Sequence, residues 1–313
     1  MMAGAPRSIL VIKLGALGDF IQALGPMAAI RGKHAADRVT LLTTAPYEGM
    51  GRACGYFDDV LLDKKPEWKD IKGWLSLRRM LNAGNFARVY DLQNNDRTAF
   101  YLRLFSPRPE WVGAARGASH RNASKERSAG RAFDGHVMTL ALAGVEGVGV
   151  DTLAWMKGAA LPEGLHPPYV LIVPGSAPSH PEKRWPAENY AALCARLSRD
   201  GYRPVLIGAK AEHDVLREIK SRAEGVLNLC GRTALADIPA LARGACAAIG
   251  NDTGPMHLIA PTGCPATVLF SGKTNPKKHA PLGARVLTLQ KEDVAALTVD
   301  EVWAAFAAQH RSP

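Results

Sequence analysis

The sequence lacks the features that mark secreted, zinc-binding or membrane-spanning proteins. Its five cysteines are scattered without CxxC spacing, which argues against a disulfide framework or a zinc site and favours reduced thiols in a cytoplasm. No apolar run approaches the length that spans a bilayer, and the first residues do not have the form of a signal peptide. We therefore expect a cytoplasmic protein.

Two common signals of nucleotide and metal sites are also missing. The dinucleotide fingerprint GxGxxG does not follow the apolar run 8–12; the chain reads GxxGD instead, with Gly15, Gly18 and Asp19. The paired acids at 58–59 are not at a strand end where ligands bind, so they do not predict a metal site. Glycines at this spacing still allow a tight turn and a ligand close to the backbone, as at the start of a Rossmann-like unit.

The chain of 313 residues has the composition of a globular protein, with 47% apolar and 22% charged residues. Its net charge of +10 favours anionic partners such as nucleotides or phosphorylated lipids, although solubility alone is an alternative explanation. The most basic stretch, 116–131, contains no interleaved aromatic residues. Nucleic-acid binding is therefore not expected.

Short apolar runs alternate with helical patterns along the chain, which predicts an α/β protein with parallel sheets. A concentration of proline and glycine at 161–168 interrupts the alternation and indicates a domain boundary. We place the first domain at 1–163 and the second at 164–313. For the amphipathic final helix, 293–307, packing back on the first domain is one expected arrangement.

The stretch 249–260 reads as the end of a buried strand, a tight loop and the start of a helix. Pro255 suits the first helical position, and Thr253 or Gly254 suits the cap. Free N–H groups and the positive end of the helix dipole make such a corner an anion site. The expected ligand is the diphosphate of a nucleotide sugar, and the alternative is an ordinary strand–helix corner.

The stretch 116–131 predicts a mobile basic loop. Glycine, serine and asparagine are frequent there, and five basic residues accompany one acid, Glu126. One interpretation is a solvated surface loop. The other is a landing site for a phosphorylated acceptor.

Three separated blocks resemble glycosyltransferase family 9, the ADP-heptose:lipopolysaccharide heptosyltransferases. The blocks are residues 12–19 (IKLGALGD), residues 174–176 with 183–186 (PGS and KRWP), and residues 229–233 with 251–257 (LCGRT and NDTGPMH). The resemblance implies a GT-B fold, in which two Rossmann-like domains face each other across a cleft. It also implies an acceptor site in the N-terminal half, a nucleotide-sugar site in the C-terminal half, and an inverting reaction that needs no metal.

The resemblance assigns roles to individual residues. Asp19 matches the expected catalytic base, for which a helix cap is the alternative role, and Lys183 is the candidate that neutralises the leaving ADP. The other residues expected to bind the nucleotide sugar are Gly18, Ser176, Glu212, Asp252, Thr253, Gly254 and His257. Of these, Glu212 matches an acid that contacts the nucleoside, Asp252 is expected to accept hydrogen bonds from sugar hydroxyls, and His257 has a capping or core role as its alternative.

The expected function is transfer of heptose from ADP-heptose to a phosphorylated glycolipid of the lipopolysaccharide inner core. No cofactor is expected, and the positive charge favours peripheral binding at the cytoplasmic face of the inner membrane. Three alternatives remain. They are a transferase of the same fold with another donor or acceptor, a nucleotide-sugar 2-epimerase, and a non-catalytic nucleotide-sugar-binding protein.

Overall fold

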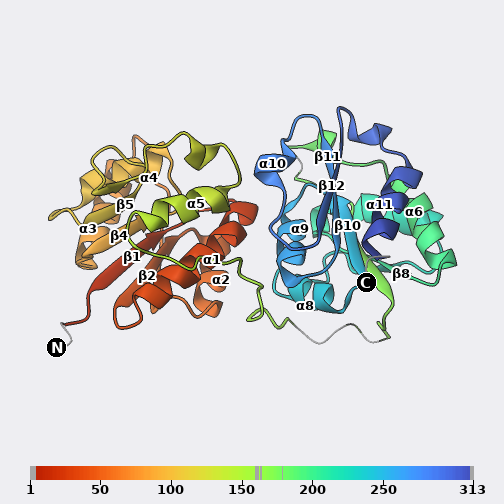
Figure 1. The fold of residues 1–313 in the computed structure, drawn as a ribbon, viewed down its shortest axis with the longest axis horizontal. Helices are drawn as coiled ribbons and strands as arrows, with labels where there is room; N and C mark the ends of the chain where they lie inside the picture. The colour runs from red at the N-terminus through yellow and green to blue at the C-terminus, as the bar shows by residue number, and fades with distance from the viewer. Residues whose placement is uncertain (1–4, 159–161, 163, 178, 311–313) are drawn as a thin grey trace. The chain divides into compact units, whose positions relative to one another are not determined.

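The computed structural model describes residues 5–158, 162, 164–177 and 179–310. The chain divides into two compact units, Met1–Asp151 and Thr152–Pro313 (Figure 1). The predicted boundary lies between residues 163 and 164, and residue 163 is outside the described residues. The observed division comes earlier because the Arg243 guanidinium donates hydrogen bonds to the carbonyls of Leu153 and Met156, which attaches this stretch to the second unit.

Each unit contains one parallel sheet, with six strands among the described residues. The strands are β1 Ser8–Ile12, β2 Arg38–Thr43, β3 Asp59–Leu62, β4 Arg88–Asp91, β5 Glu110–Gly113, β6 His120–Arg121, β7 Tyr169–Val173, β8 Arg203–Leu206, β9 Leu227–Asn228, β10 Ala247–Asn251, β11 Ala266–Ser271 and β12 Val286–Lys291. The strand order is β3-β2-β1-β4-β5-β6 in the first sheet and β12-β11-β10-β7-β8-β9 in the second. The two units therefore share one Rossmann-like topology.

This order puts β1 beside β4 and β7 beside β10 at the centre of each sheet. The direction in which the chain adds strands reverses at these two pairs. In open α/β sheets, ligands bind outside the carboxyl ends of the strands at such a reversal. Most of the residues selected from the sequence follow one of these four strands.

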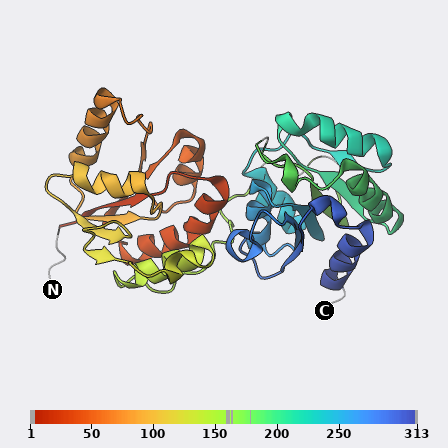
Figure 2. The same ribbon diagram turned by 90° about the horizontal axis from the view of Figure 1, so that it is seen from above.

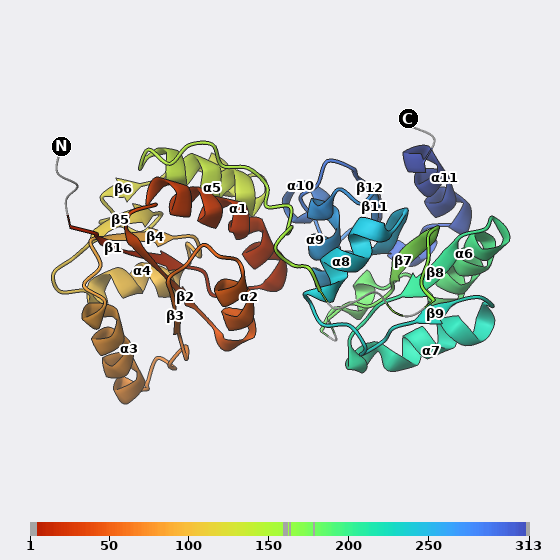
Figure 3. The same ribbon diagram turned by 90° about the horizontal axis from the view of Figure 1, so that it is seen from below.

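Helices cover both faces of the first sheet, which explains why its central strands are apolar on both sides. Helices α1 (Leu17–Lys33) and α5 (Ala132–Ala141) pack side by side on one face, and α3 (Ile71–Ala83) and α4 (Asp96–Tyr101) lie on the opposite face (Figures 2 and 3).

In the second unit, α6 (Ala187–Arg199), α7 (His213–Arg222) and α11 (Val299–His310) share one hydrophobic core. The Arg196 guanidinium of α6 lies 4.3 Å from the centre of the Trp303 ring, so α11 packs on its own unit. Helices α8 (Asp237–Gly244) and α9 (Gly254–Ile259) pack against each other. No helix in the described part of the chain is both long and apolar enough to cross a membrane.

Several elements lacked a clear pattern and were not predicted. They are the strands β5, β6 and β12 and the short helices α2 (Glu48–Ala53) and α10 (Pro276–His279). The stretch 116–131, predicted to be a mobile basic loop, is mostly turns and irregular structure, but it contains β6, paired with β5, and a 3₁₀ helix, η3 (Glu126–Ser128). The strands among these elements gain their hydrogen bonds from a neighbouring strand, a tertiary effect that residue periodicity does not carry.

Candidate active site

In the second unit, the side chain of Asn251 joins the carboxyl ends of β7 and β10. Its Oδ1 accepts hydrogen bonds from Trp185 N at 3.1 Å and from the Tyr190 hydroxyl at 2.8 Å, and its Nδ2 donates to Pro174 O at 2.6 Å. Asn251 is fully buried, so water does not compete for these bonds. The amide therefore fixes the loop after β7 and the start of α6 against β10.

Lys183 and Asp252 form an ion pair at this edge. Lys183 ends a 3₁₀ helix, η4 (Pro181–Lys183), Asp252 follows β10, and the distance from Nζ to Oδ2 is 2.7 Å. The lysine side chain is 21% exposed and the aspartate side chain 7% exposed, so the pair is open to solvent on the lysine side. An anion that binds here would compete with Asp252 for the lysine charge.

The Ser176 hydroxyl is already engaged within its own loop. It donates to His180 O at 2.8 Å and accepts from Arg184 Nε at 2.9 Å. Ser176 thereby orients the side chain of Arg184, the residue that follows Lys183. The role predicted for Ser176 in binding phosphate stays a prediction, and Arg184 adds a second cation that was not selected from the sequence.

Glu212 reaches the same edge from the end of β8. It ends the 3₁₀ helix η5 (Lys210–Glu212), and its Oε2 accepts a hydrogen bond from Ala209 N at 2.7 Å. A Cβ atom added at Gly175 would lie 1.5 Å from Glu212 Oε1, and one at Gly208 would lie 2.9 Å from Oε2. The carboxylate therefore lies against two glycines. Partial burial raises its pKa.

The predicted strand–loop–helix corner is present after β10. Thr253 is the cap residue of α9, and its side chain makes no capping hydrogen bond. Gly254 is the first helical residue, so Pro255 occupies the second position and not the first. His257 is buried, as are the other residues of the second half of this six-residue helix.

In the first unit, Asp19 is the third residue of α1, one residue after Gly18, whereas the cap residue is Ala16. Capping is therefore not its role. Burial raises the pKa of the Tyr47 phenol, and the nearby Asp19 charge adds to the rise. Gly15, with φ +129°, lies against the same ring, because a Cβ there would be 2.8 Å from Tyr47 Cε2.

Near Asp19, Lys13 after β1, Asp91 at the end of β4 and His136 of α5 form a buried polar cluster. Lys13 Nζ donates to Leu92 O at 3.1 Å, and burial lowers the pKa of its ammonium while the Asp19 and Asp91 charges oppose that shift. Burial raises the pKa of Asp91 to about 6 and lowers the pKa of His136 to about 3. The cluster therefore contains one buried cation with two carboxylates nearby.

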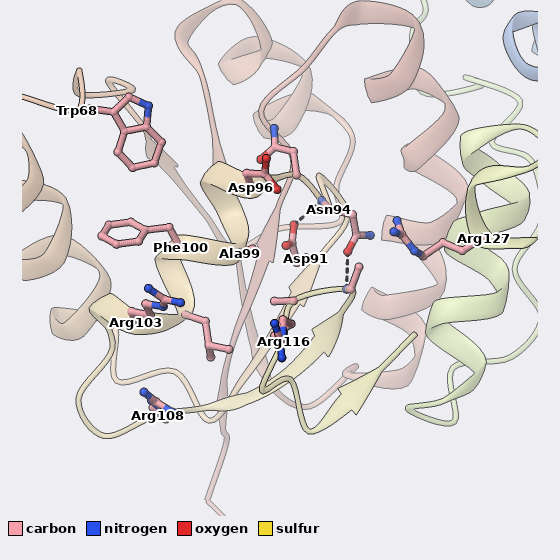
Figure 4. Close-up of a pocket in the computed structure, with 14 residues that line it drawn as sticks. Trp68, Asp91, Asn94, Asp96, Ala99, Phe100, Arg103, Arg108, Arg116 and Arg127 are labelled. Carbon is pink, nitrogen blue, oxygen red and sulfur yellow. Dashed lines mark hydrogen bonds between the residues drawn. The ribbon is translucent and has the colours of Figure 1, made fainter. Parts of the chain in front are cut away.

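A pocket of about 650 Å³ opens beside the end of β4 (Figure 4). Four arginines line it from different elements: Arg103 from the 3₁₀ helix η2 (Leu102–Leu104), Arg108 before β5, Arg116 after β5 and Arg127 from η3. The rings of Trp68 and Phe100 form its apolar wall, and their centres are 5.7 Å apart. An anionic ligand with an apolar portion suits this lining.

The structure thus gathers the selected residues at two strand edges, one in each unit. Asp19 and Gly18 lie at the first; the remaining seven residues lie in the segments that follow β7, β8 and β10 in the second. Sequence reasoning missed Lys13, Asp91 and Arg184. A lysine or aspartate directly at the end of an apolar run was the available signal for the first two.

Comparison with known proteins supports one family. The model of "Glycosyltransferase family 9 (heptosyltransferase)" matches residues 74–301, which is more than half of the chain. Lipopolysaccharide heptosyltransferase 2 of Salmonella typhimurium is 34% identical over 129 residues, which cover 39% of this chain and only 36% of that relative.

Two solved structures share the fold. A glycosyltransferase family 9 protein from Veillonella parvula superposes with a TM-score of 0.81 at 20% identity and covers 98% of both chains. Heptosyltransferase WaaC of E. coli, solved with ADP, superposes with a TM-score of 0.75 at 16% identity and covers 96% of this chain and 99% of that one. Likeness over nearly the full length identifies the α/β two-domain fold as GT-B.

Proposed function

The chain belongs to glycosyltransferase family 9 (heptosyltransferase), and we propose that it transfers heptose from ADP-heptose to a phosphorylated glycolipid of the lipopolysaccharide inner core. We propose further that the transfer inverts the anomeric configuration, uses no metal ion, and takes place at the cytoplasmic face of the inner membrane. The observation that carries the proposal is the pair of charged strand edges, one in each unit, at the reversal points of two sheets with the same topology.

In the proposed reaction, an acceptor hydroxyl oxygen attacks C1 of the heptose while the bond from C1 to the diphosphate oxygen breaks. Asp19 takes the proton of that hydroxyl, and ADP leaves with the bonding electrons. The Lys13 side chain lies near Asp19, and the Asp19 charge opposes the lowering of the Lys13 pKa by burial. A carboxylate in the first turn of a helix is a weak base, so its contribution comes mainly from positioning.

The second unit supplies the donor site in this proposal. Lys183 moves its charge from Asp252 to the diphosphate, and Arg184 lies next to it. The released Asp252 carboxylate accepts hydrogen bonds from sugar hydroxyls. Thr253 and Gly254 contribute a hydroxyl and a backbone N–H to the phosphates, and His257 lies one turn further along α9. Glu212, which lies against Gly175, accepts hydrogen bonds from the ribose hydroxyls.

The first unit supplies the acceptor site. The arginine-lined pocket next to the end of β4 is suited to the phosphate or carboxylate groups of a core glycolipid. Arg116 and Arg127 come from the basic stretch 116–131, which supports the acceptor interpretation of that stretch.

The first test is a thermal-shift titration with ADP, UDP, GDP and CDP, followed by ADP-heptose. A ligand that binds only the folded state raises the melting temperature. We expect selective stabilisation by ADP and its loss in Lys183→Ala. A preference for UDP would favour another transferase or the epimerase, and no response to any nucleotide would overturn the donor assignment.

The second test is turnover of ADP-heptose with a core glycolipid acceptor, with and without EDTA. We expect ADP release, a product whose new linkage has the opposite anomeric configuration, and an unchanged rate in EDTA. A retained configuration or a rate abolished by EDTA would contradict the mechanism. ADP release without a glycosylated product would indicate hydrolysis only.

A further inference from the structure

An apolar surface with a basic margin lies on α3 and on the loop before it. Trp68, Ile71 and Leu75 are 63%, 71% and 46% exposed, and they account for three of the seven large exposed apolar side chains among the described residues. Ile71 and Leu75 are four positions apart and lie on one side of α3, and Trp68 lies in the turn before the helix. The opposite side of α3 carries the buried Leu77 and Leu81, so the helix is attached to its unit by a different face.

Exposed basic residues are frequent in the same segment of the chain. Within 64–79 the exposed basic residues are Lys64, Lys65, Lys69, Lys72, Arg78 and Arg79. The exposed acids of the same segment are Glu67 and Asp70, and Asp70 is occupied as the cap of α3, accepting a hydrogen bond from Gly73 N at 2.8 Å. Cations therefore outnumber acids on this face, which we name the α3 face.

The α3 face is held rigidly by aromatic contacts. The Trp68 and Trp74 rings stack with their centres 5.3 Å apart, and the Arg97 guanidinium lies 5.4 Å from the Trp68 ring and donates to Pro66 O at 3.1 Å. The Trp74 Nε1 donates to Glu67 O at 2.9 Å. One side of Trp68 is thus packed against the protein, and the rest of the ring stays in solvent in a fixed position.

We propose that the α3 face is the surface by which this protein binds an anionic lipid bilayer. Apolar side chains enter the headgroup region, a tryptophan anchors at the interface, and lysines and arginines lie against anionic headgroups. A second protein copy fits less well, because the same excess of cations on both partners would repel across a symmetric contact. The protein would bind the bilayer peripherally.

The location deepens the proposed function, on which this step rests. Trp68 belongs both to the α3 face and to the wall of the arginine-lined pocket (Figure 4). A glycolipid whose acyl chains stay in the bilayer would then present its phosphorylated sugars to a pocket at the edge of the membrane contact. The protein would not need to extract its acceptor from the membrane.

The test is co-sedimentation with vesicles of phosphatidylcholine alone and of equal parts phosphatidylcholine and phosphatidylglycerol, without donor or acceptor. We expect binding to the anionic vesicles only, and weaker binding at higher salt. Ile71→Gln with Leu75→Gln should lower the affinity at least about tenfold. Lys72→Ala and Arg79→Ala should each lower it about fivefold.

The matched control is Met138→Gln with Leu142→Gln, a second exposed apolar pair four positions apart, on α5 and its C-terminal cap. This variant should bind anionic vesicles like the wild type, and both double variants should keep the wild-type melting temperature and its shift with ADP. A wild type that ignores anionic vesicles, or an α3 variant that binds them normally, would overturn the assignment.

Sedimentation velocity addresses the competing occupant. A wild-type dimer that becomes monomeric in Ile71→Gln with Leu75→Gln would assign the α3 face to a second copy and reject the membrane proposal. Because no nucleotide or acceptor enters the vesicle assay, a failure of the proposed heptosyl transfer would leave the vesicle result unaffected. The two proposals therefore fail separately.

Discussion

The two units have the same strand order, yet different residues stand at the carboxyl ends of their central strands. In the first, β4 ends in Asp91, whose pKa burial raises to about 6, close to the buried Lys13. In the second, β10 ends in Asn251, a neutral amide whose oxygen and nitrogen both have partners. One topology thus supports a strand end with an ionisable carboxyl group close to a buried lysine, and a strand end whose neutral amide holds the neighbouring loops in place.

The largest expected effect separates the two edges by function. Asp19→Asn should lower kcat about 10²–10⁴-fold, because the proton acceptor is lost, while the thermal shift with ADP stays unchanged. Lys183→Ala should weaken the shift with ADP. The control is Asp214→Asn, another aspartate in the first turn of a helix but 92% exposed, which should keep full activity. Loss of ADP binding in Asp19→Asn would contradict the division.

Exchanging the two strand-end residues tests the difference in charge. Asn251→Asp should lower the free energy of unfolding at pH 7 by about 3–5 kcal/mol, because a buried carboxylate would replace the donor to Pro174 O. Asp91→Asn keeps an acceptor for the amides of Gln93 and Asn94 and should change stability by about 1 kcal/mol or less. Chemical denaturation measures both.

The control for this exchange is Asn275→Asp, at the exposed cap of α10, where stability should change by about 0.5 kcal/mol or less. Equal losses in Asn251→Asp and Asp91→Asn would remove the distinction between the two edges.

A glycine of the second edge offers a steric test. Gly175→Ala would push its Cβ into Glu212 Oε1, so we expect a loss of about 1–3 kcal/mol in unfolding free energy together with weaker ADP binding. Gly32→Ala is the control, since a Cβ there meets no atom within 4 Å and should stabilise α1 by about 0.5–1 kcal/mol. Unaltered ADP binding in Gly175→Ala would contradict the proposed contact between Glu212 and the nucleotide.

The smallest expected effect is on the pH dependence of stability, and it involves His136 of the first unit. His136 is buried and its pKa falls to about 3, whereas an unfolded histidine titrates near 6.5. Its contribution to stability is therefore complete above pH 6.5 and is lost progressively as the pH falls towards 3. Between pH 6.5 and 5.5, the wild type should lose up to about 1.4 kcal/mol of unfolding free energy through His136, and the variant His136→Gln should not show this loss.

The control for the pH experiment is His213→Gln, whose side chain is 61% exposed and which should keep the wild-type pH slope. Denaturation of each protein at both pH values provides the comparison. An identical slope in wild type and His136→Gln would show that burial of His136 does not control the acid response of the first unit.

Much of the fold could be predicted from local pattern. The runs that became β1 and β7 are apolar without alternation, as strands buried on both faces must be, and the blocks around Asp19, Lys183 and Thr253 carry the family resemblance. Strands β5 and β6 escaped because they are only four and two residues long and show little period. Strand β12 also escaped, although it has six residues and lies at the end of its sheet.

The sequence by itself determined the two Rossmann-like units, the family and the strand-end residues, because each of these follows from local periodicity or a short motif. Only the tertiary structure decided which side chains meet. Lys183 pairs with Asp252 across 69 positions, Glu212 lies against Gly175, and four arginines from separate elements line one pocket. Contacts of this kind depend on strand order and on the direction of each side chain, and both are settled only when the sheets assemble.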